Sequence, residues 1–135
     1  HDIELTLNMV KDCKPDDIGI SVSYPLPGTK FYENVKHELG EKRNWIDSQD
    51  LDPMYEGPYS KEFYRALHSV THKKFRIWQG IEYMKKTLSH PSKINKHTLR
   101  RIAATGYHAL TLPGQLSRMR ALENGASPGR KASLV

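Results

Sequence analysis

The chain has 135 residues and a formal net charge of +6, and its length suits one domain. Only 37% of the residues are hydrophobic, so we expect a thin core. The single cysteine, Cys13, excludes an internal disulfide and favours a reducing compartment, and we expect it to be a small buried hydrophobe. No apolar run approaches the ~20 residues that span a bilayer and no secretory signal pattern opens the chain, so we expect a cytoplasmic protein without a transmembrane segment.

The opening residues predict a helix and then a strand. Asp2 can cap a helix that runs to about Asp12. In residues 17–23, bulky apolar side chains alternate with small ones, the period-two signature of a β-strand. The alternating residues are Ile18, Ile20 and Val22 against Gly19, Ser21 and Ser23.

A rigid turn and a second helix follow the strand. Pro25 and Pro27 fix their own φ angles before Gly28 allows the chain to turn. Thr29 can cap a helix over residues 30–39, in which three apolar side chains are spaced four apart and Gly40 can end the helix. The three apolar residues are Phe31, Val35 and Leu39.

The second half of the sequence predicts three more helices. Residues 41–59 are irregular, and Ser60 can cap a long helix that Pro91 ends. Its expected apolar stripe is Phe63, Leu67, Val70, Ile77, Ile81, Met84 and Leu88, and the aromatic residues Tyr64, Phe75, Trp78 and Tyr83 favour helix packing over a ligand pocket. A helix over about 95–110 is separated by Pro113-Gly114 from a short one ending near Asn124-Gly125, and residues 126–135 predict disorder.

Charge is divided unevenly along the chain. Residues 1–60 hold six Lys and Arg against twelve Asp and Glu, whereas residues 61–135 hold fifteen against three. One interpretation is that the basic half docks on acidic residues of the same polypeptide, near Asp47, Asp50 and Asp52. The alternative is an anionic partner for residues 61–135, either nucleic acid or a membrane surface. No stacking motif, recognition helix or zinc finger accompanies the charge.

Four groups of residues carry a resemblance to a known family. They are Asp17-Asp-Ile-Gly-Ile-Ser-Val-Ser-Tyr-Pro-Leu-Pro-Gly-Thr29, Asn44-Trp-Ile-Asp-Ser48 with Asp50-Leu51, Phe63-Tyr-Arg-Ala-Leu-His68, and His72-Lys-Lys-Phe-Arg76. In order and spacing they resemble the late part of a radical S-adenosylmethionine (SAM) enzyme barrel of the group with an amino-terminal cobalamin-binding domain. The resemblance covers roughly the first 80 residues.

This resemblance implies a fold and a domain organisation. The chain would be a mainly α carboxy-terminal fragment in which a remnant of the (β/α) barrel, helix-strand-helix, precedes a helical extension. Residues 1–40 would end the barrel, 41–59 would connect, 60–124 would form the extension and 125–135 a disordered tail. The partners would be the missing cobalamin and barrel regions of the same enzyme.

The resemblance also implies a cofactor site. Because barrel enzymes bind ligands at the carboxyl ends of their strands, the implied SAM-binding residues are Ser21, Ser23, Tyr24, Pro25 and Leu26. The full-length enzyme would use a 4Fe-4S cluster, SAM and cobalamin for radical methyl transfer or rearrangement. The cluster needs a Cys-x3-Cys-x2-Cys loop, and one cysteine cannot supply it. We therefore expect the isolated chain to be catalytically incomplete, with no catalytic residue, metal ligand or cofactor of its own.

Two further hypotheses stand beside the fragment. The chain could be a basic helical module that binds an anionic polymer or membrane, or a remnant without function. His68 and His72 share a helical face at a spacing that can bind a metal. No clear third ligand is near in sequence and Ser69 stands where the metalloprotease motif has Glu, so surface or packing histidines are the favoured interpretation.

Overall fold

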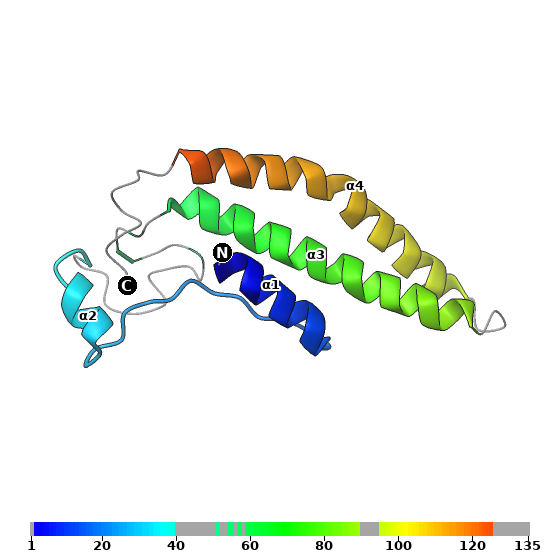
Figure 1. Cartoon of the computed structure of the whole chain (residues 1–135), viewed down its shortest axis with the longest axis horizontal. Coiled ribbons are helices and arrows are strands. Elements are labelled where there is room, and N and C mark those ends of the chain that lie inside the picture. The colour runs from blue at the N-terminus through cyan, green and yellow to red at the C-terminus, as the bar shows by residue number, and fades with distance from the viewer. Residues whose placement is uncertain are drawn as a thin grey trace. The chain divides into compact units, whose positions relative to one another are not determined.

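The computed structural model describes residues 2–39, 51, 54–55, 57, 59–89 and 95–125. The described residues form four helices, α1 (Asp2–Cys13), α2 (Lys30–Val35), α3 (Lys61–Leu88) and α4 (Lys96–Asn124), and no strand (Figure 1). The chain is therefore mainly helical, as predicted. No helix in this described part is both long and apolar enough to cross a membrane.

The predicted strand at residues 17–23 is wrong, because these residues belong to no regular element. A β-ladder needs a neighbouring strand, and the described residues supply none. The amide of Ile18 instead bonds the Asp17 carboxylate Oδ1 at 3.0 Å.

Contacts divide the chain into two compact units. The first unit comprises residues 1–18 and 68–117, and the second comprises 19–67 and 118–135.

In the first unit, α3 lies between α1 and α4 and runs antiparallel to α4 (Figure 1). The side chain of Thr105 of α4 packs directly against Gly80 of α3. Val70 and Phe75 are buried, and so are Thr98 and Thr105 of α4. The core of this unit is therefore small, and the buried residues of α4 are threonines.

Helix α1 ends with a residue in the left-handed conformation. Lys14 has φ +47°, and its amide donates to the Val10 carbonyl at 3.2 Å. This is the αL cap that glycine usually provides. Two expectations for this helix are wrong. Asp2 is part of the helix rather than the cap before it, and Cys13 is exposed rather than buried.

Helix α3 begins as predicted, since Ser60 Oγ accepts a hydrogen bond from the Phe63 amide at 3.3 Å. Its apolar stripe is buried only in its first half: Phe63 and Val70 are buried, whereas Ile81 and Leu88 are exposed. The second half of α3 contacts α4 through Gly80 and Tyr83, which lie off the stripe. Phe75, expected to pack between helices, is 2% exposed and belongs to the core.

The predicted break at Pro113-Gly114 is also wrong, because α4 continues through Pro113 to Asn124. Proline removes one backbone donor, and its ring crowds the carbonyl of Ala109, at a cost of about 3 kcal/mol. Helical turns on both sides retain their hydrogen bonds and outweigh this local loss.

The second unit contains the predicted turn and α2. The Thr29 amide donates to the Leu26 carbonyl at 3.1 Å and Gly28 has φ +87°, so residues 26–29 form a tight turn that needs glycine. Thr29 Oγ1 accepts from the Tyr32 amide at 3.1 Å, which confirms the predicted cap.

Helix α2 ends at Val35, before the predicted limit, and a turn follows it. Val35 and Leu39 nevertheless pack with Met54 in a buried cluster, and Phe31 packs against it. The rings of Tyr59, Phe63 and Tyr64 form a separate aromatic cluster. Burial and the neighbouring tyrosines raise the pKa of Tyr64 to about 12. Residues 41–50, Pro91 and 126–135, for which connector, helix stop and disorder were predicted, lie outside the described residues.

Candidate functional site

The residues implied as SAM-binding lie together on the segment that leads into the turn before α2. Pro25 is buried, whereas Ser21 and Ser23 are exposed. Tyr24 is 37% exposed and Leu26 is 56% exposed. Their assignment as a cofactor site stays a prediction.

The histidine pair of α3 forms as its spacing predicts. The rings of His68 and His72 have centroids 4.3 Å apart. Burial lowers the pKa of His68, and its neighbour His72 lowers it further, so the neutral form of His68 is favoured. Among the described residues, no cluster of three or more His, Cys, Asp or Glu side chains could hold a metal ion.

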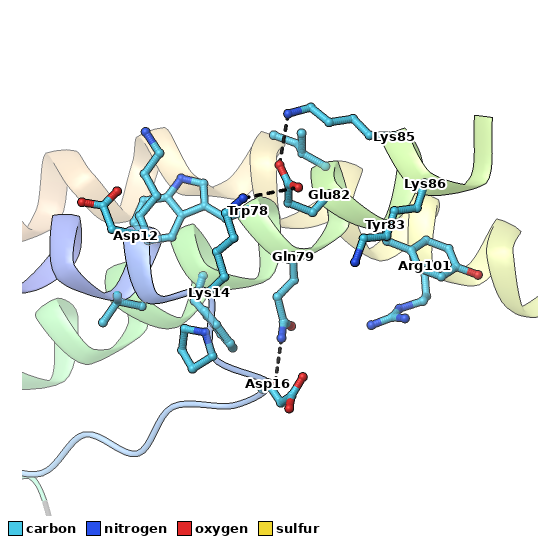
Figure 2. A pocket seen from close by; sticks show the side chains of 15 residues that line it. Asp12, Lys14, Asp16, Trp78, Gln79, Glu82, Tyr83, Lys85, Lys86 and Arg101 are labelled. Carbon is cyan, nitrogen blue, oxygen red and sulfur yellow. Dashed lines mark hydrogen bonds and ion pairs between the residues drawn. The ribbon is translucent and has the colours of Figure 1, made fainter. Parts of the chain in front are cut away.

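A groove of about 660 Å³ lies in the first unit, between the end of α1 and the second half of α3 (Figure 2). Residues 10–12 and 14–16 form one wall, and Phe75, Trp78 and Tyr83 contribute aromatic surface from α3. Arg101 of α4 closes one end, with its guanidinium carbon 4.4 Å from the centre of the Tyr83 ring. The site therefore combines aromatic surface with charged side chains from three helices.

Polar contacts fix the chain that leaves α1 against α3. Gln79 Nε2 donates to the Asp16 carbonyl at 2.7 Å (Figure 2). Arg76 bonds the Asp17 carboxylate at 3.3 Å. The same Arg76 donates to Gln79 Oε1 at 3.1 Å. The wall of the groove is thus held by side chains one turn apart on α3.

Glu82 stands at the centre of the charged rim. Lys85 Nζ lies 3.0 Å from one of its carboxylate oxygens and Lys14 Nζ 3.8 Å from the other (Figure 2). The bond from Lys85 lowers the pKa of Glu82 most, and the charge of Lys14 adds to the effect. Glu82 is therefore ionised at neutral pH.

The rim is basic after these pairs are counted. Five cations line the groove against three carboxylates; the cations are Lys11, Lys14, Lys85, Lys86 and Arg101, and the carboxylates are Asp12, Asp16 and Glu82. A site of this kind can hold an anionic group beside an aromatic ring. None of the described residues that line the groove is a Ser, Thr, Cys or His.

Sequence reasoning did not find this groove. The sequence signals Trp78 and Tyr83 as packing aromatics and Arg101 as one basic residue among many. These residues come together because residues 10–16 pack on α3. One bond in that contact, from Gln79 to the Asp16 carbonyl, joins positions 63 residues apart. No local pattern carries that information.

Comparison with protein-family models, with curated proteins and with solved structures gives no match.

Proposed function

We propose that this chain is the carboxy-terminal part of a cobalamin-type radical SAM enzyme. The missing barrel would bind the 4Fe-4S cluster, and residues 21–26 would line the pocket for SAM. The enzyme would cleave SAM reductively and start radical methyl transfer or rearrangement. This chain would contribute binding surface and no proton-transfer group.

The observation that carries the proposal is the segment from Asp17 to Thr29. In order and spacing it resembles the family's sixth strand and turn. The rigid turn forms at Gly28 and the helix cap at Thr29. Its period-two residues pair with no strand among the described residues. Backbone groups of that kind are satisfied in a barrel by the neighbouring strands.

The proposal is tested first on the DNA upstream of the His1 codon. We expect one open frame that encodes a Cys-x3-Cys-x2-Cys loop and, before it, a cobalamin-binding domain. A stop codon or unrelated sequence in that frame would remove the basis of the proposal.

The second test is anaerobic reconstitution with iron and sulfide. The extended polypeptide should acquire a cluster and release 5′-deoxyadenosine from SAM, whereas the 135-residue chain should do neither, because one thiol cannot replace three. A stoichiometric cluster and product from the short chain would contradict this assignment.

A matched pair of leucine variants tests the residues of the site. Leu26 is 56% exposed and Leu5 is 54% exposed, so Leu26→Ala and Leu5→Ala remove similar side chains from similarly exposed positions. In the extended enzyme, Leu26→Ala should weaken SAM binding about fivefold through lost apolar contact, and Leu5→Ala should not. Equal effects of the two substitutions would count against the assignment of residues 21–26.

A further inference from the structure

Helix α4 presents threonines to α3 and aliphatic residues to solvent. Thr98 is fully buried and lies 3.1 Å from the Tyr83 hydroxyl. Thr105 is 8% exposed and packs against Gly80. The side of α4 that faces its partner is therefore polar and small, the reverse of the usual arrangement for a surface helix.

The large apolar side chains of α4 lie away from that contact. Leu99 is 61% exposed and Leu110 is 84% exposed, and Ile102 is 41% exposed. With 3.6 residues per turn, Leu99 and Leu110 share one face with the small residues between them. We call this surface the aliphatic face of α4; its members are Leu99, Ile102, Ala103, Gly106 and Leu110.

The charge beside this face has one sign. Lys96 and Arg100 are exposed and lie one helical turn apart at its edge. From Lys96 to Ser117 the sequence contains no Asp or Glu. The face therefore offers apolar side chains and uncompensated cations together, without a carboxylate that would repel an anionic surface.

This combination distinguishes between anionic partners. A nucleic acid backbone would use the cations and leave the leucines in water. An anionic bilayer uses both, because its headgroups attract Lys and Arg while the boundary with the acyl chains accepts aliphatic side chains. We propose that the aliphatic face of α4 docks on an anionic lipid surface, with Leu99 and Leu110 inserted and with Lys96 and Arg100 at the phosphate level.

The test is co-sedimentation with vesicles of phosphatidylcholine containing phosphatidylserine, compared with phosphatidylcholine alone. The wild-type chain should bind the anionic vesicles more tightly, and added salt should weaken that binding. Leu110→Gln should lower the partition coefficient about tenfold through lost apolar burial. Arg100→Gln should lower it about fivefold through the lost charge.

Matched variants off the face are the controls. Leu5→Gln changes a leucine of α1 that is 54% exposed, and Lys30→Gln removes an exposed cation of α2. Both should leave vesicle binding unchanged. Circular dichroism of each variant should match the wild type, because these side chains are exposed.

Three results would overturn the proposal. One is vesicle binding that Leu110→Gln leaves unchanged. Another is binding of RNA or DNA as tightly as anionic vesicles, with neither kind of binding weakened by Leu110→Gln. That result would assign the basic surface to nucleic acid. The third is a dimer in sedimentation equilibrium that Leu110→Gln dissociates, which would make a second copy of the chain the occupant.

Discussion

The contact between Gly80 of α3 and Thr105 of α4 predicts a destabilising glycine-to-alanine change. A Cβ built on Gly80 would lie 2.7 Å from Thr105 Cγ2 and 2.8 Å from its Cβ, closer than carbon atoms approach. Thr105 cannot turn aside freely, because its hydroxyl donates to the Arg101 carbonyl at 2.8 Å. Overpacking costs about 1–3 kcal/mol, and the gain in helix propensity returns about 1 kcal/mol. We therefore expect Gly80→Ala to lower the free energy of unfolding by up to about 2 kcal/mol.

Urea denaturation followed by circular dichroism measures this change, and Gly106→Ala is the matched control. Gly106 also lies inside a helix, beside Thr105, but nothing lies within 4 Å of a Cβ built there. Gly106→Ala should therefore stabilise the chain by about 1 kcal/mol. In a Thr105→Gly background, Gly80→Ala should lose most of its cost. Our reasoning about this contact is refuted if Gly80→Ala is as stable as Gly106→Ala.

Three further substitutions or conditions test other parts of the first unit. Lys14→Gly should raise the free energy of unfolding in urea by about 0.5–1 kcal/mol, because Lys14 has φ +47° and its pair with Glu82 is exposed; a loss of stability would contradict the αL cap. Thr98→Val should cost about 1–2 kcal/mol in the same assay by removing the partner of the Tyr83 hydroxyl, whereas Thr6→Val on exposed α1 should change little. Burial, and then His72, lowers the pKa of His68. Burial, and then Lys73 and Arg76, lowers the pKa of His108. Near these pKa values the unfolded chain therefore binds more protons than the folded chain. The melting temperature should thus fall as the pH drops from about 7.5 through the ordinary histidine value to about 5.5, and a double substitution of these two histidines by Gln should flatten the fall.

Local features of the fold could be predicted from the sequence because local rules determine them. Thr29 and Ser60 cap their helices as predicted, and Gly28 takes the positive φ angle that the turn requires. The strand at residues 17–23 failed for the opposite reason, since pairing depends on residues elsewhere. Pro113 failed because proline weakens a helix by a limited amount, and the turns around it decide whether the helix continues.

The candidate groove could not be predicted, because it depends on which side of α3 its neighbours cover. The apolar stripe of α3 predicted burial of Ile81 and Leu88, yet both are exposed. Helix α4 instead contacts α3 at Gly80, which has no side chain. The interface is therefore not marked by a hydrophobic residue in the sequence. Amphipathic periodicity identifies a face that can be buried, whereas the contact partner and the remaining exposed surface follow from tertiary packing.

The cations of the basic half differ in whether they have an acidic partner within the chain. The basic half of the chain does meet acidic residues of the first half, but at Asp17 and the Asp16 carbonyl; the expected partners Asp47, Asp50 and Asp52 lie outside the described residues. Arg76 uses this internal contact, and Lys85 bonds Glu82 of its own helix. The described part of α4 from Lys96 to Ser117 has no carboxylate of its own, and Lys96 and Arg100 remain at the edge of its exposed leucines. Contacts within the chain therefore engage Arg76 and Lys85 of α3, whereas Lys96 and Arg100 of α4 lie exposed beside its leucines and can meet an external anionic surface.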